Sequence, residues 1–497
     1  MNLQFQKKEV PCLKSPLTQV QNLEQTQELR IPEGMPGAAR ILAGWGQVLL
    51  RSKEWNRDNV HVSGGVLVWV LYEPEDGSQP RRLETWIPFQ MNWDLPEDIP
   101  EGRARIRPLL RYVDARTVSS GKVMIRVGIG LLAQCWCPHR GEVSQMEDET
   151  GEVELLHTRW PVRLPREAGE KPFDMEEALS LPASAPAIEQ VVYFRMEPMV
   201  SDRKVLGNRM VFRGNGNLHL LYRSEEGQLH SWDFELPFSQ YTDLEDSYSP
   251  DAQADVMMAV TRLELEPDGE GKLNLRAGMT GQYLVDDRDM LDLVEDAYLP
   301  GRDVSLNREN LELPVLLDSR RENIYGEQTV PAGAEMVADT AFLPDFPRQR
   351  REGDNVVLEQ PATAQILYYD DAGRLQSAQQ RWEGSMTIPA DEGASLTAMP
   401  QYVQEQVIPG TDSMQLRAEV PVQLIAMGGQ GMPMVTQLEA GEKREPDPNR
   451  PSLVLRRANG RLWDLARASG STMAAIREAN GLTGEPEPGK ILLIPVM

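Results

Sequence analysis

The segment Cys135-Trp-Cys137-Pro-His139 holds the residues best suited to metal chemistry. Thiolates and an imidazole are ligands that zinc prefers. A structural zinc site needs four ligands, however, and the sequence has no second cysteine pair, while the next histidine is His157. We therefore predict ordinary thiols at the end of a strand, and no metal. With Cys12 the chain has three cysteines, too few and too unevenly placed for a disulfide framework.

Residues 484–490 fit the first seven positions of a phosphate-binding P-loop, Gly-x-x-x-x-Gly-Lys. The next residue is Ile491, where the motif needs a Ser or Thr hydroxyl for Mg²⁺. An apolar strand follows, whereas phosphate binding requires a helix N-terminus at that point. We predict a plain loop before a strand, and no bound cofactor.

No pattern for acid–base or nucleophilic catalysis stands out. The five histidines form no His-Glu-x-x-His motif, and no Gly-x-Ser-x-Gly elbow occurs. Acidic pairs such as Asp286-Asp287 are expected on a solvated surface or turn in so acidic a chain. We predict no catalytic residues, although a hydrolase built on two distant carboxylates stays open, because folding can bring them together.

Residues 452–497 have the pattern of a small β-α-α-β domain. Apolar side chains recur three and four positions apart in two segments, Leu462, Leu465 and Ala466, then Met473, Ile476 and Ala479. This spacing places them on one face of each of two short helices. The Ser471 and Thr472 hydroxyls suit the N-cap of the second helix, and Asn480-Gly481 suits its end. Residues 491–495 predict a closing strand.

This pattern resembles a LysM domain, a module that recognises glycans or proteins. The resemblance implies a partner-binding surface formed by Asn459, Gly460, Arg461, Leu462, Trp463, Leu482, Thr483 and Gly484. For Leu462 and Trp463, packing inside the helix core is the favoured role. Glycan-binding LysM domains usually carry an acidic residue and then Thr or Ser before the Leu-Trp pair, where this chain has Gly460 and Arg461. The change disfavours peptidoglycan as the ligand.

The chain is strongly acidic, with a formal net charge of -25 over 497 residues. This charge argues against non-specific nucleic-acid binding, which needs Lys and Arg for the phosphates. It also disfavours docking on anionic lipid. From Pro451 onward, six basic residues outnumber four acidic ones. A mildly basic module on an acidic body favours a specific docking role.

The N-terminal segment shows no targeting signal. No apolar stretch follows Lys7 and Lys8, so no secretory signal is predicted. No run of 18 apolar residues exists, so no membrane-spanning helix is predicted. We expect a cytoplasmic chain, which also disfavours attachment to a cell wall.

The body of the chain contains a diverged internal repeat. The motif Leu-Tyr-x-x-x-x-Gly begins at Leu71, Leu221 and Leu367, and so recurs after 150 and then 146 residues. Gly121-Lys122 and Gly271-Lys272 keep the offset of 150. Several anchors at one offset indicate duplication.

The predicted fold class is mainly β, with three diverged β-sandwich-like repeats followed by the small β-α-α-β domain. Residues 414–424 alternate apolar and polar side chains, as a half-buried strand requires. The predicted organisation is β domain 1 at 1–142, a linker at 143–175, β domain 2 at 176–295, β domain 3 at 310–432, a linker at 439–451 and the LysM domain at 452–497. Prolines in the second linker predict a semi-rigid arm that holds the last domain away from the body.

The whole arrangement resembles SipL-type spore coat morphogenetic proteins, which join tandem SPOCS domains to a C-terminal LysM domain. The segments that carry the likeness are Ile-Pro-Glu-Gly-Met-Pro at 31–36, Leu-Pro-Ala-Ser-Ala-Pro at 181–186, the Leu-Tyr-turn-Gly hairpins and the strands after Gly121 and Gly271. The resemblance implies a protein of the mother-cell cytoplasm at the forespore surface. It also implies that the LysM domain binds a coat basement-layer ATPase, with other coat proteins as further partners.

Three functions follow in order of preference. The first is a non-enzymatic protein that assembles the spore coat and docks through its LysM domain. The second is a protein that binds peptidoglycan or N-acetylglucosamine, disfavoured by the missing signal and the altered loop. The third is a spore-wall hydrolase with a LysM targeting tag, disfavoured by absent catalytic motifs and by the similarity of the repeats.

Overall fold

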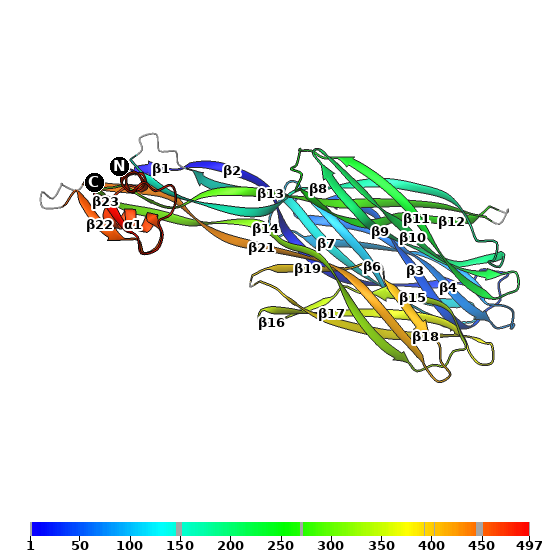
Figure 1. The fold of residues 1–497 in the computed structure, drawn as a ribbon. Coiled ribbons are helices and arrows are strands. Elements are labelled where there is room, and N and C mark those ends of the chain that lie inside the picture. Colours follow the sequence, from blue (N-terminus) through cyan, green and yellow to red (C-terminus); the bar gives the residue numbers. More distant parts are fainter. Residues whose placement is uncertain are drawn as a thin grey trace.

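The computed structural model describes residues 2–145, 152–268, 272–391, 393–401, 403–443 and 451–496. Strands make up most of it, and two short helices lie near the C-terminus, so the predicted mainly-β class is confirmed. The molecule is elongated (Figure 1). A broad β body lies at one end, long strands leave it as a stalk, and the β-α-α-β module sits at the tip of that stalk beside the N-terminus.

Three copies of one two-sheet unit form the body. The first copy contains β2 (Gln6–Arg30), β3 (Ala38–Trp55), β4 (Asn59–Pro74), β5 (Arg81–Asp94), β6 (Arg103–Ser119) and β7 (Lys122–Gln145). The second contains β8 (Glu154–Ser180), β9 (Ile188–Leu206), β10 (Arg209–Ser224), β11 (Leu229–Asp243), β12 (Gln253–Pro267) and β13 (Lys272–Tyr298). The third contains β14 (Arg302–Val330), β15 (Met336–Pro344), β16 (Arg348–Glu352), β17 (Asn355–Tyr369), β18 (Leu375–Pro389), β19 (Ser395–Pro400), β20 (Gln404–Ile408) and β21 (Met414–Lys443).

The strand order is the same in each copy. In the first copy a β3-β4-β5 meander accompanies a β2-β7-β6 sheet, and the second copy repeats this plan as β9-β10-β11 and β8-β13-β12. The third copy has two broken strands. There β15 and β16 both pair with β17, and β19 and β20 both pair with β21. The short β1 (Asn2–Gln4) also pairs with β21.

Alternating apolar residues form the cores of the copies, and the core of the second copy also includes Trp45 and Trp69 of the first and Leu367 of the third. In the third copy the predicted alternation over 414–424 is confirmed, because Met414, Leu416, Val420 and Val422 are all buried. Burial of one face of each sheet against the other supplies most of the stabilisation of such a sandwich. Each copy thus supplies the alternating residues of its own two sheets, while the core of the second copy is shared with both neighbours.

The three copies close into a ring. Trp45 of the first copy stacks on Tyr193 of the second, with ring centroids 4.5 Å apart. The Tyr193 hydroxyl donates to Asp339 of the third copy at 3.2 Å. Arg40 of the first copy donates to the Gln376 side chain of the third at 2.9 Å. Each copy therefore touches both of the others.

A buried glutamine joins the edge of one sheet to the next copy. Ile106 lies on β6, an edge strand whose backbone groups need partners. Its N–H donates to Gln282 Oε1 at 2.7 Å, and Gln282 Nε2 donates to the Ile106 carbonyl at 2.8 Å. The side-chain amide of Gln282 thus acts as one more peptide group on the edge of the first copy.

The stalk consists of three two-stranded ribbons, β2/β7, β8/β13 and β14/β21 (Figure 1). Buried residues from all three ribbons share one core, among them Val143, Leu164, Leu293, Leu313 and Met432. Each ribbon has a register shift near its base, between Lys14 and Leu17, Val285 and Asp286, and Leu316 and Asp318. Such bulges bend and twist a strand pair, here at the place where each ribbon leaves the body.

These ribbons differ from the predicted domain boundaries. Strand β8 begins at Glu154, inside the predicted linker 143–175, and residues 296–298, 302–309 and 433–443 also lie in strands. A ribbon buries only the side chains that face the other two ribbons, so apolar positions such as Val162 and Leu164 are sparse among charges. That pattern is easily taken for a linker. Residues 146–151 lie outside the described residues.

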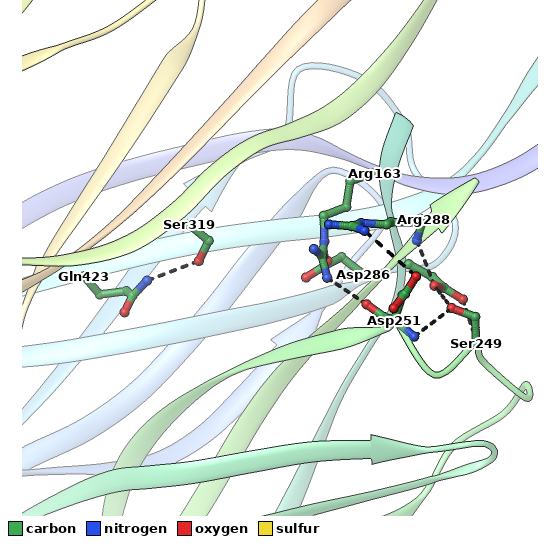
Figure 2. A network of polar contacts seen from close by, with 8 residues as sticks. Arg163, Ser249, Asp251, Asp286, Arg288, Ser319 and Gln423 are labelled. Carbon is green, nitrogen blue, oxygen red and sulfur yellow. Dashed lines mark hydrogen bonds and ion pairs between the residues drawn. The ribbon is translucent and has the colours of Figure 1, made fainter. Parts of the chain in front are cut away.

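A polar network fixes the base of the second ribbon (Figure 2). Arg163 pairs with Asp286 and donates to the Asp251 carbonyl at 3.2 Å. Asp287 accepts from both the N–H and the hydroxyl of Ser249, at 2.9 and 2.5 Å. Asp286 and Asp287 are 5% and 8% exposed, so the prediction of a solvated acidic pair is wrong. Burial raises the pKa of Asp286, and Arg163 opposes that rise.

In the third ribbon, Gln423 Nε2 donates to Ser319 Oγ at 3.2 Å (Figure 2). Ser319 follows the bulge at Leu316 and Asp318. The Gln423–Ser319 bond and the Arg163–Asp286 pair both use side chains within a few residues of a bulge, where ladder hydrogen bonds are interrupted. They therefore stabilise the bend at the base of the ribbon.

The cysteines lie inside strands and not at a strand end. Cys135 and Cys137 are buried in β7, and Cys12 is buried in β2. Burial raises the pKa of Cys135 to about 12 and that of Cys12 to about 11. Such thiols stay protonated and are poor nucleophiles. Within the described part of the chain, no group of three or more His, Cys, Asp or Glu residues could hold a metal ion.

Candidate functional site

The C-terminal module follows the predicted β-α-α-β order. It contains β22 (Leu453–Arg457), α1 (Leu462–Ser469), α2 (Met473–Asn480) and β23 (Ile491–Pro495). The two strands pair antiparallel, with Leu455 opposite Leu493. Asn480 ties α2 to β23, because its amide accepts from the Leu493 N–H at 2.7 Å and donates to the Leu493 carbonyl at 2.6 Å.

The helix ends show how the module forms. The predicted N-cap of α2 is confirmed, because Thr472 Oγ1 accepts from the Ala475 N–H at 3.0 Å. Gly470 and Gly481 end the two helices in the left-handed conformation, with φ of 60° and 58°. At α1 the N-cap residue is Arg461, whose side chain makes no capping bond. Glu485 supplies the missing acceptor, since its carboxylate accepts from the Leu462 N–H at 2.8 Å.

This contact brings two sequence-predicted loops together. Asn459, Gly460 and Arg461 belong to the loop before α1, and Leu482, Thr483 and Gly484 to the loop before Glu485. All are exposed except the partly buried Leu482. Arg461 pairs with Asp464 at 3.3 Å on the surface. Both loops are thus largely exposed, and the Glu485 contact joins the second loop to the N-terminus of α1, where the first loop ends.

Leu462 and Trp463, by contrast, are 0% and 2% exposed. Leu462 packs in the module core with Ala466, Ile476 and Leu492. Trp463 belongs to the same cluster but also reaches the stalk. The preferred interpretation of both residues as core positions agrees with this placement, and neither offers a surface to a partner.

The module is seated on the tip of the second ribbon. The ring of Trp463 meets that of Tyr298 edge-on, with centroids 4.9 Å apart. The Tyr298 hydroxyl donates to the Ser471 carbonyl at 2.8 Å, and burial raises the pKa of that hydroxyl. Glu154 of β8 accepts from the Met473 N–H at 3.3 Å, at the start of α2. Contacts from both strands of one ribbon thus fix both helices.

Asp296 is the centre of this seat. Its Oδ2 accepts from Trp463 Nε1 at 3.1 Å and pairs with Arg467. Its Oδ1 accepts from Arg308 of β14 at 2.7 Å. The carboxylate is only 13% exposed, and charged and neutral donors from the third ribbon and the module hold it in place. Sequence reasoning missed this residue, because one more aspartate in an acidic chain carries no signal.

The seat differs from the predicted semi-rigid arm. Strand β21 continues to Lys443, and residues 444–450 of the predicted linker lie outside the described residues. Whatever the path of that segment, the module contacts the stalk directly. The buried ring of Trp463 explains the difference, because a large aromatic side chain stabilises a contact that linker composition does not reveal.

The outer face of the β22–β23 sheet is an exposed apolar surface. None of its residues is among those predicted from the sequence to bind a partner. Leu453, Leu455 and Ile491 are 51%, 69% and 61% exposed. Their neighbours Leu492 and Ile494 are buried, so the strands alternate between the module core and solvent. We call the three exposed side chains the sheet face. Arg456, Arg457 and Lys490 are exposed nearby.

Residues 187–267 match the family model described as SipL, SPOCS domain. This span covers the meander β9-β10-β11 and strand β12 of the second copy. No curated protein and no solved structure matches the chain. The match supports a relationship to the SipL-type family over the second copy. Neither helix of the described residues is long and apolar enough to cross a membrane.

Proposed function

We propose that the protein is a non-enzymatic assembly protein of the spore envelope. The match of residues 187–267 to the SipL SPOCS domain supports a role in sporulation. In this proposal the three β copies and their stalk form a rigid spacer. The C-terminal module is a LysM domain that docks onto a coat basement-layer ATPase. The protein acts in the mother-cell cytoplasm at the forespore surface, helps to encase the forespore and meets other coat proteins there.

The observation that carries the docking role is the sheet face. The seat on the stalk uses α1 and the start of α2, so it leaves the opposite side of the module uncovered. Three large aliphatic side chains, each more than half exposed, lie there on a two-stranded sheet with five residues in each strand. Exposed apolar clusters on soluble domains mark interaction surfaces. Nearby arginines favour a partner with acidic residues at the rim of its site.

The loops favour a protein partner over a glycan. Glu485, the acidic group between them, already caps Leu462, and Arg461 already pairs with Asp464. The Glu485 carboxylate and the Arg461 guanidinium are thus used within the module. An N-acetyl sugar needs free donors and acceptors to fix its orientation.

A pull-down from sporulating cells tests the proposal. The full chain and a chain lacking residues 452–497 are compared as baits, with mass spectrometry of the captured proteins. We expect the coat ATPase with the full chain and its loss upon deletion. Retention of that ATPase by the deleted chain would overturn the docking role. Tight binding of N-acetylglucosamine oligomers by the full chain, abolished by the deletion, would favour the glycan alternative.

A further inference from the structure

A pocket of about 220 Å³ lies between the first and third copies. Three arginines line it, Arg111 of β6, Arg348 of β16 and Arg381 of β18. Two carboxylates, Asp345 and Glu383, also line it. Guanidinium groups therefore outnumber carboxylates here, although acidic residues far outnumber basic ones in the chain as a whole. Solubility explains an acidic surface but not this local reversal.

The strand register places the arginines on one face. Arg381 lies opposite Thr363, and Arg348 lies opposite Glu359. Residues 359, 361 and 363 of β17 point to the same side of the sheet, because side chains alternate along a strand. The opposite side holds buried residues such as Leu358 and Ala364. Arg348, Arg381 and Thr363 thus lie on the same, outer face of the third copy.

Arg111 completes the pocket from the first copy. Its Nε donates to Asp345 Oδ2 at 2.6 Å, and Asp345 Oδ1 accepts from the Phe346 N–H at 2.8 Å. This fixes the guanidinium plane of Arg111 and neutralises Asp345. Among the described residues, no ion pair within 4 Å engages Arg348 or Arg381. Two arginines without an ion-pair partner therefore line the same pocket as a third whose guanidinium is held by Asp345.

We propose that this arginine pocket binds a phosphate group. Guanidinium forks match the oxygen pairs of phosphate and bind it through charge-assisted hydrogen bonds. Three such groups and the Thr363 hydroxyl suit a tetrahedral dianion that offers several acceptors. The bound group would join β6 of the first copy to β16 and β18 of the third. The site is separate from the C-terminal module, so the proposal does not rest on the docking role.

Equilibrium dialysis of the full chain against radiolabelled inorganic phosphate tests the site. We expect saturable binding of about one phosphate per chain. Replacing both unpaired arginines, Arg348→Gln with Arg381→Gln, should weaken binding about tenfold or more. The matched control is Arg350→Gln with Arg374→Gln, because these arginines already pair with Glu352 and Asp370. That control should bind like the wild type.

Competition by phosphoserine, in a second arm, would assign the site to phosphate carried on a protein; competition by inorganic phosphate alone would assign it to the free anion. Binding that does not saturate, or that both double variants weaken equally, would overturn the proposal. Both variants change exposed side chains, and an unchanged melting temperature verifies that they fold.

Discussion

The indole Nε1 of Trp463 lies 3.1 Å from Oδ2 of Asp296, the carboxylate that also binds Arg308 and Arg467. Trp463 belongs to the C-terminal module and Asp296 to the stalk. The pair therefore sets which side of the module faces the rest of the chain and which side faces solvent. Because α1 is turned toward the stalk, the sheet face points away from it.

Replacing Asp296 with Ala should loosen the module from the stalk. The change removes the acceptor of a buried indole N–H and one partner of two arginines, at a cost of about 1–3 kcal/mol. Hydrogen exchange at the start of α2 should become faster, because the Met473 N–H depends on the seat for its bond to Glu154. Asp292→Ala is the control on the same strand, since the Asp292 side chain pairs with the exposed His157 on the ribbon. Equal exchange in both variants would contradict the seat.

Replacing Gln282 with Leu should lower the free energy of unfolding by about 2–4 kcal/mol, because the Ile106 N–H and C=O both lose their partner. The matched change is Gln134→Leu. Gln134 is also a buried glutamine, on β7, but its Oε1 has no hydrogen-bond partner among the described residues. That change should alter stability by less than about 1 kcal/mol. Urea denaturation measures both, and equal losses would show that Gln282 has no special role between copies.

His219 should make stability depend on pH. Burial alone lowers its pKa, but Asp339 at 2.8 Å and Asp233 at 2.6 Å raise it to about 9. The folded-state pKa thus exceeds the ordinary value of 6.5. The stabilisation, on the order of 3 kcal/mol, is fully present below about pH 6.5 and is lost as pH rises through about 9.

The measurement for His219 is the difference in unfolding free energy between the wild type and His219→Gln from about pH 6 to pH 10. We expect the difference to shrink as pH rises. A constant difference would mean that the imidazole is not charged in the folded state. Asp339 is only 1% exposed and belongs to the third copy, so the effect reports on the contact between copies.

Much of each repeat could be predicted, since its two sheets bury apolar residues at alternate positions, as over 414–424. The stalk could not. Residues such as Val162 are buried only because ribbons from distant parts of the chain meet there. The loops of the module were predictable, because helix-end residues such as Thr472 and Gly481 are local signals. Asp296 was not, because its partners come from distant parts of the chain. The predicted β domains left out residues 143–175 and 296–309, because the local strand signals are weak there.

Replacing Glu485 with Ala should fray the first turn of α1, because the Leu462 N–H loses its acceptor. The expected cost is about 1 kcal/mol. Adding Arg461→Asp should restore protection, since an N-cap carboxylate can accept from the same turn. Glu487→Ala, in the same loop, is the control. Hydrogen exchange of the α1 amides reports all three, and an unprotected double variant would contradict this account of the cap.

In our proposal the sheet face docks this protein onto the coat ATPase. The most direct test is the dissociation constant between the purified ATPase and the full chain, compared with Leu455→Asp and Leu206→Asp. Leu206 is 51% exposed on β9 of the body and serves as the control. The account predicts binding weakened about tenfold or more by Leu455→Asp and unchanged by Leu206→Asp. Unchanged binding by Leu455→Asp would contradict it.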